Sequence, residues 1–136
     1  MDRQAVYEKA GLHLLKQGRK SKTGSLCRYR NAEGLACAIG ALIPNERYND
    51  SMEDIGVTYL LSHADTFGRD DGVACLRSAL EDGFGELTDG DVHFLFLLQT
   101  IHDRCGPADW KAKLVDLSYK HDLDNTKILN FTRENG

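Results

Sequence analysis

The 136-residue sequence contains only two prolines and no long apolar run. The few prolines mark element boundaries, and the short apolar runs argue against a membrane helix. Pro44 and Pro107 stand where one structural element is expected to give way to the next. The longest apolar runs, 35–43 and 92–98, fall well short of the ~20 residues that a membrane helix needs. The first six residues contain no basic region that leads into an apolar stretch. We therefore expect no membrane span and no signal peptide.

The cysteines show no metal-binding spacing. Cys27 and Cys37 have nine residues between them, and no CxxC pair occurs. A structural zinc usually takes its four ligands from two close pairs, so His93 or His102 would have to complete such a set. The spacing favours simple packing over zinc, and it leaves open whether Cys27 and Cys37 ever bond. Without an export signal, we expect reduced thiols in a cytoplasm.

Enzyme motifs are also missing. The chain has no GxSxG, phosphate loop, GxGxxG, EF-hand or HExxH sequence. His102-Asp103 is the dipeptide of the helical HD phosphohydrolases, so a metal-dependent hydrolase is one alternative. The other is that His102 bonds a carboxylate or a backbone carbonyl at the edge of the core. If Glu53 and Asp54 lie near Asp103, paired carboxylates could also carry out acid–base catalysis. On balance we expect a protein that is not an enzyme, with no metal and no cofactor.

Cations are concentrated in one part of the chain. Residues 16–30 contain six basic residues and no acid, a net charge of +6. The whole chain carries −4, so the remainder carries −10, the difference between the two. This asymmetry predicts an anion-facing patch on an acidic body, although a solvated loop would show the same pattern. The candidate binding residues are Arg19, Lys20, Lys22, Arg28, Tyr29 and Arg30.

Three aromatic residues stand near charged ones. Tyr29, Tyr48 and Trp110 could form a stacking or cation–π surface beside Arg28 and Arg30. The alternative is that they anchor the core, with hydroxyl and indole groups satisfied at its rim. The pattern favours core anchoring.

Apolar spacing predicts a mainly helical chain. An amphipathic helix is expected over 2–18, with Asp2 as its N-cap and Gly18 at its C-terminal end. The clearest helix spans 88–105, where Thr88 begins a sequence close to a capping box. Shorter helical segments are expected at 45–55, 56–64, 72–82, 107–121 and 126–133.

One segment predicts strands. Alternating residues 26–30, then a turn, then apolar residues 35–38 are typical of a β-hairpin. Small residues in 36–43 would let another part of the backbone approach closely. The expected fold is therefore mainly α (α+β): one compact domain, 1–136, of about five to six helices with a small β-hairpin near 26–38.

The hairpin segment also carries a family resemblance. Residues 27–44 read CxYRxxxGLxCAIGxLIP, and 98–103 read LQxIHD with Trp110 following. Together these motifs are similar to a family of small, uncharacterised proteins of tailed bacteriophages and prophages. The resemblance covers most of the chain in order and is least in 60–90. It implies a host bacterial cytoplasm and a small accessory role, and it implies no active site.

These observations lead to one functional expectation with two alternatives. We expect an accessory protein that binds a host or phage protein and modulates it without catalysis, for example as an inhibitor or in anti-defence. One alternative is nucleic-acid or nucleotide binding through 16–30, against which stands a pI of about 5.7. The other is the hydrolase at His102-Asp103. Self-association into a homo-oligomer is compatible with the sequence, although no heptad run predicts it.

Overall fold

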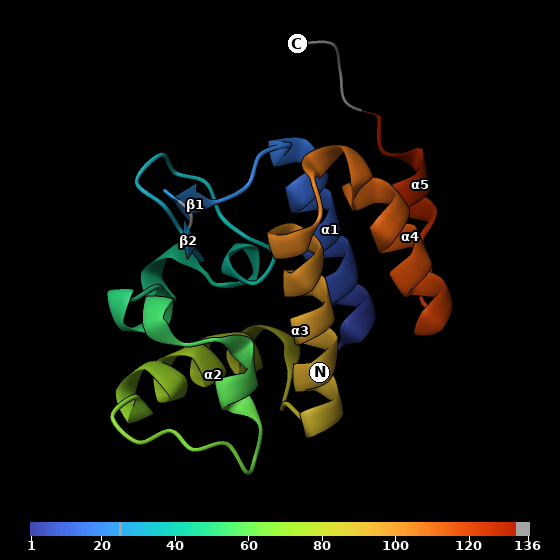
Figure 1. Cartoon of the computed structure of the whole chain (residues 1–136). Helices are drawn as coiled ribbons and strands as arrows, with labels where there is room; N and C mark the ends of the chain where they lie inside the picture. The colour runs from blue at the N-terminus through green and yellow to red at the C-terminus, as the bar shows by residue number, and fades with distance from the viewer. Residues whose placement is uncertain (25, 133–136) are drawn as a thin grey trace.

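The computed structural model describes residues 1–24 and 26–132, and in these ranges the chain is mainly helical with one small hairpin (Figure 1). The α-helices are α1 (Arg3–Gln17), α2 (Asp70–Phe84), α3 (Asp89–Arg104), α4 (Trp110–Lys120) and α5 (Thr126–Asn130). The antiparallel strands are β1 (Lys22–Thr23) and β2 (Leu26–Cys27). This confirms the predicted fold class. The last residue of the helix predicted at 126–133 lies outside the described residues.

Two central helices organise the molecule. α1 and α3 lie side by side, with α4 and α5 on one side of them and the β1–β2 hairpin on the other (Figure 1). α2 crosses the lower end in this view. Short 3-10 helices connect these parts: η1 (Gly40–Leu42), η2 (Asn45–Arg47), η3 (Asp50–Asp54), η4 (Val57–Leu60) and η5 (Pro107–Asp109). Several of them cover the predicted segments 45–55 and 56–64.

The ends of α1 and α3 follow from the sequence. The Asp2 carboxylate accepts a hydrogen bond from the N–H of Ala5 (3.0 Å), and Gly18 ends α1 with a left-handed φ of 65°. Thr88 and Asp91 form a full capping box at the start of α3. Both predicted helices are confirmed to within a residue or two at each end.

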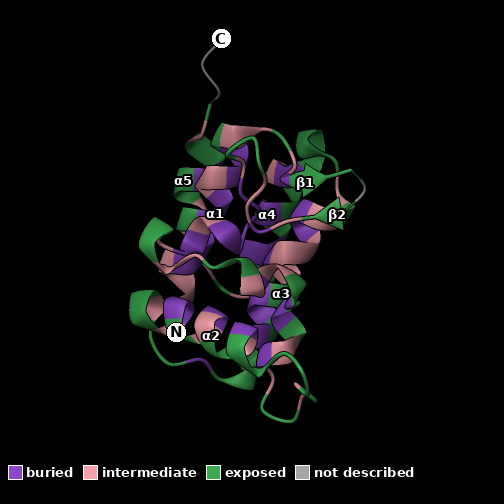
Figure 2. Ribbon diagram, turned by 90° about the vertical axis from the view of Figure 1, so that its left-hand side faces the viewer, coloured by how far each residue is buried: buried purple, intermediate pink, exposed green. Residues whose placement is uncertain are grey.

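The core lies mainly between α1 and α3 and their neighbours, where buried residues line the inner faces (Figure 2). Trp110 is fully buried, and its indole N–H donates to the carbonyl of Cys105 (3.1 Å). Its ring stacks on His102 with centroids 5.6 Å apart. Trp110 is therefore a core anchor, the alternative that the sequence favoured.

The hairpin lies earlier in the chain than predicted. Its register pairs Lys22 with Cys27, whereas the predicted arms, 26–30 and 35–38, meet in a single isolated bridge between Arg30 and Ala36. The reason is that the backbone N–H groups of Tyr29 and Arg30 donate to a side chain instead of to a second strand. The predicted polar loop 19–25 therefore contributes one strand of the hairpin.

That side chain is Glu53 of η3, whose carboxylate is only 8% exposed. Its Oε1 accepts from the N–H of Tyr29 (3.0 Å), and its Oε2 accepts from the N–H of Arg30 (3.1 Å) and from the Tyr48 hydroxyl. The Arg28 guanidinium lies 3.9 Å from Oε2. One buried carboxylate thus fixes the path of the chain as it leaves the hairpin, and burial together with this hydrogen bond raises the pKa of Tyr48 to about 12.

The backbone of Gly40 lies very close to the segment that Glu53 holds. Gly40, at the start of η1, is buried against the carbonyl of Tyr29, and a Cβ at this position would overlap that oxygen. The small residues of 36–43 were expected to permit such a contact, and at Gly40 they do. The approach brings η1 against the segment that Glu53 holds.

Replacing Glu53 with glutamine tests the carboxylate. In Glu53→Gln the amide NH₂ would face a backbone N–H, so one buried donor loses its acceptor. We expect a loss of about 3 kcal/mol in the free energy of unfolding, measured by urea denaturation. Glu46→Gln, at an exposed position of η2, should change it by less than about 0.5 kcal/mol. Equal effects of the two variants would contradict the role given to Glu53.

Gly40→Ala tests the backbone contact. The added methyl group has no space beside the Tyr29 carbonyl, so we expect a loss of about 3 kcal/mol in the same measurement. Gly83→Ala is the matched control, since a Cβ there meets nothing within 4 Å and lies inside α2. It should stabilise the protein by up to about 1 kcal/mol, because alanine is the better helix former.

Candidate functional site: the basic hairpin and the cluster beneath it

The β1–β2 hairpin carries an exposed apolar side chain and several cations. Leu26, on β2, is 71% exposed, and Lys22 lies on the adjacent strand. Lys20 precedes the hairpin and Arg28 follows it. We call Lys20, Lys22, Leu26 and Arg28 the hairpin surface.

A groove runs along one edge of this surface. Its volume is about 650 Å³, and three of the predicted binding residues, Arg19, Lys20 and Lys22, line it. Arg19 is paired with Glu33 in the same groove, at 2.8 Å, and both side chains are well exposed. Such an exposed pair contributes at most about 1 kcal/mol, so Arg19 can exchange Glu33 for another anion.

The other predicted residues lie on the far edge of the hairpin and in the core. Tyr29 is 7% exposed, its hydroxyl donates to the Ile55 carbonyl, and burial raises its pKa. The Arg30 guanidinium donates to the Asn45 side chain and to the carbonyl of Ile43. The structure therefore brings Arg19, Lys20 and Lys22 together and directs Tyr29 and Arg30 into internal contacts.

Arg28 is intermediate between these groups. Its Nε donates to the Arg30 carbonyl at 3.2 Å, while about a third of its side chain stays exposed. It lines a second hollow, of about 390 Å³, together with Thr23, Arg30 and Tyr48. The Arg30 guanidinium lies over the Tyr48 ring, 5.4 Å from its centroid, so the cation–π contact that was the less favoured alternative does form for this pair.

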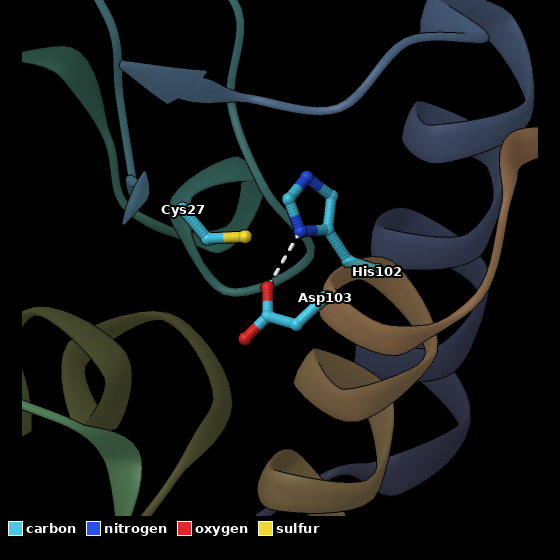
Figure 3. A group of neighbouring side chains, drawn as sticks. All are labelled: Cys27, His102 and Asp103. Atoms are coloured by element: carbon cyan, nitrogen blue, oxygen red, sulfur yellow. Dashed lines mark hydrogen bonds and ion pairs between the residues drawn. The ribbon is translucent and has the colours of Figure 1, made fainter. Parts of the chain in front are cut away.

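Beneath the hairpin, three side chains from distant parts of the sequence meet (Figure 3). Cys27 of β2 faces His102 and Asp103 at the end of α3, and their ligand-type atoms lie within 4.8 Å of one another. His102 Nδ1 is 2.7 Å from Asp103 Oδ1. Nothing in the sequence indicates this meeting, because Cys27 stands alone and the HD dipeptide is 75 positions further on.

The hydrogen bonds of His102 define its tautomer. The backbone N–H of Ser21 donates to Nε2 at 2.9 Å, so Nε2 carries a lone pair and Nδ1 carries the proton that bonds Asp103. His102 is fully buried. The sequence alternative in which His102 bonds a carboxylate at the edge of the core is thus confirmed.

The same bonds argue against a metal at this cluster. A metal on Nδ1 would move the imidazole proton to Nε2, where it would point at the Ser21 N–H. A histidine that ligates a metal instead donates its second N–H to an acceptor. The donor set therefore does not fit a metal, and the geometry gives no support to a metal-dependent hydrolase at His102-Asp103.

Nor is the thiol arranged as a nucleophile. Partial burial of the thiol and the negative charge of the neighbouring Asp103 raise the pKa of Cys27. A catalytic cysteine needs an imidazole nitrogen that is free to accept the thiol proton, whereas His102 Nδ1 already carries the proton that bonds Asp103 and Nε2 accepts from the Ser21 N–H. Cys37 is fully buried, and burial raises its pKa to about 12.

The expected acidic pair forms a small pocket. Glu53, Asp54 and Asp103 line a hollow of about 180 Å³ together with Cys27. Because Glu53 is occupied by the backbone N–H groups of Tyr29 and Arg30, this carboxylate serves the fold rather than proton transfer.

Sequence reasoning missed one residue of the surface. No functional signal in the sequence pointed to Leu26, whose side chain is among the most exposed large apolar ones described. On β2 it alternates with Cys27, which faces His102 and Asp103, so Leu26 points away from them.

Comparison with protein-family models, curated proteins and solved structures gave no match. None of the described helices is both long enough and apolar enough to cross a membrane.

The environment of the thiol predicts its reactivity. At pH 8 the raised pKa keeps Cys27 protonated, so iodoacetamide should modify it slowly despite its exposure. Asp103→Asn keeps an acceptor for His102 and removes the negative charge, so alkylation should become several-fold faster. Peptide-resolved mass spectrometry measures both rates. Asp109→Asn, an exposed change on η5, should leave the rate as it was, and an equally slow reaction in the Asp103 variant would refute the assignment.

Proposed function

We propose that the protein acts by binding a partner protein, without catalysis, at the hairpin surface. The observation that carries the proposal is the exposure of Leu26, 71%, on a hairpin flanked by cations. An exposed apolar side chain on a hairpin that also carries cations is complementary to an apolar pocket with acidic residues beside it. Burying a leucine contributes about 1.5–3 kcal/mol, and the cations accelerate encounter and select the partner.

The hairpin is held in place before any partner arrives. A two-stranded hairpin of this length is marginal by itself. Here the Lys20 ammonium donates to the carbonyl of Asp103 (3.1 Å), Ser21 donates to His102, and the Asn31 amide donates to the carbonyl of Lys22 (3.1 Å). Binding would therefore need little further ordering of the backbone, which favours affinity.

Several observations favour a protein partner over a nucleic acid. Outside 16–30 the chain carries −10, and this charge would repel a phosphate backbone. Of the predicted cations, Arg30 is committed to internal carbonyls and Lys20 to the Asp103 carbonyl. An exposed leucine contributes little to phosphate contacts.

The proposal extends to a biological setting. The similarity of 27–44 and 98–103 to small phage and prophage proteins favours an accessory protein in the bacterial host cytoplasm. Its partner would then be a host or phage protein that it inhibits or modulates. The roles found for Cys27 and His102 as structural hydrogen-bonding groups are compatible with such a protein.

Paired variants test the surface. Lys22→Glu combined with Leu26→Ser reverses one cation and removes the exposed side chain. Lys113→Glu combined with Tyr119→Ser makes the same kind of change on α4, across α1 and α3 from the hairpin, where Tyr119 is 73% exposed (Figure 1). Each protein is used to capture partners from nuclease-treated bacterial lysate, and the purified partner is then titrated by calorimetry.

We expect a protein that the wild type and the α4 variant retain and that binds the hairpin variant at least about tenfold more weakly. Retention that disappears on nuclease treatment would transfer the function to nucleic-acid binding. Equal binding by the two double variants would place the partner elsewhere on the molecule.

A further inference from the structure

A second concave surface lies where the loop 61–69 enters α2. This hollow has a volume of about 810 Å³. We call it the acidic groove; Asp54, Phe67, Arg69, Asp70 and Asp71 are among the residues that line it.

The charges of this groove are opposite to those of the hairpin surface. Asp54, Asp70 and Asp71 line it against one cation, Arg69, whose guanidinium lies over the Tyr59 ring, 5.1 Å from its centroid. The net charge of the lining is therefore negative, and the only cation is already in contact with an aromatic face.

The groove also carries an exposed apolar side chain. Phe67 is 88% exposed, the largest value among the large apolar residues described. Its position is held by local bonds, since its N–H donates to the Asp65 carboxylate (3.1 Å) and the Thr66 hydroxyl donates to the Asp70 carboxylate (2.6 Å). An ordered loop that presents a bare phenyl ring beside carboxylates is complementary to a cationic segment with one apolar side chain.

The chain itself displays such a segment. We propose that the acidic groove receives the hairpin surface of a second copy, with Leu26 against Phe67 and with Lys22 and Arg28 facing Asp70 and Asp71. This proposal rests on the proposed function in one respect, because it uses the same hairpin surface, now occupied by a copy of the chain.

The positions of the hairpin surface and the acidic groove allow two copies to form a closed dimer. The hairpin and the loop that enters α2 lie on the same side of the molecule, away from α4 and α5 (Figure 1). A two-fold axis on that side puts each hairpin opposite the groove of the other copy, so each contact is made twice and both surfaces are used. A dimer, rather than an open chain of molecules, is the expected assembly.

This dimer and the partner would compete. A free partner finds the hairpin surface occupied in the dimer, so the monomer is the binding form. Because the contact depends on opposite charges at the surface, raising the salt concentration weakens the dimer.

Sedimentation velocity of the purified protein alone tests the proposal. The weight-average mass should rise from 15.2 kDa toward twice that value with concentration, and less so at high salt. Lys22→Glu and Asp71→Lys should each weaken the dimer about tenfold or more. An equimolar mixture of these two variants should dimerise again, because each changed charge meets the other. Phe67→Ser should also weaken the dimer, while Tyr119→Ser should not.

The outcomes separate this inference from the proposed function. A monomer at all concentrations, or a mixture that stays monomeric when wild type dimerises, overturns the inference. Partner capture that depends on Leu26 in a protein that never dimerises overturns it too, and leaves the proposed function in place. A salt-sensitive dimer restored by the mixed variants supports the inference, whether or not capture yields a partner.

Discussion

The buried carboxylate of Glu53 is the constraint on which the rest of the structure depends. It accepts two successive backbone N–H groups and the Tyr48 hydroxyl, and it faces the Arg28 guanidinium. A buried carboxylate is tolerated only when its oxygens are satisfied in this way. By holding the chain after β2, Glu53 also permits the contact between Gly40 and the carbonyl of Tyr29, which places η1 in the core.

The hairpin combines a rigid base with an exposed tip. Its base bonds to the end of α3 through Lys20 and Ser21, and Leu26 points outward next to the turn. Cys27, His102 and Asp103 are residue types common in active sites, but here they lie where the hairpin joins α3. The feature that remains for function is the exposed hairpin surface, so binding is the better interpretation.

Local signals in the sequence predicted well where the neighbours along the chain decide the structure. Asp2 and Gly18 bound α1, and Thr88 begins α3, because caps act on groups within four residues. The register of the hairpin was not predictable in this way. It depends on Glu53, more than twenty positions from the N–H groups of Tyr29 and Arg30 that bond its carboxylate.

The position of Asp103 links the hairpin to the stability of the last turn of α3. A carboxylate in the last turn of a helix is unfavourable, because the helix dipole is negative there. Several donors offset this cost for Asp103: Lys20 bonds its carbonyl, and Gln99 and His102 bond its side chain. If the hairpin detaches, the final turn of α3 loses the Lys20 bond and the Ser21 bond that orients His102, and it frays with the hairpin. The hairpin and this helix end therefore form one unit of local unfolding, within which the Ser21 amide exchanges with solvent only when both open.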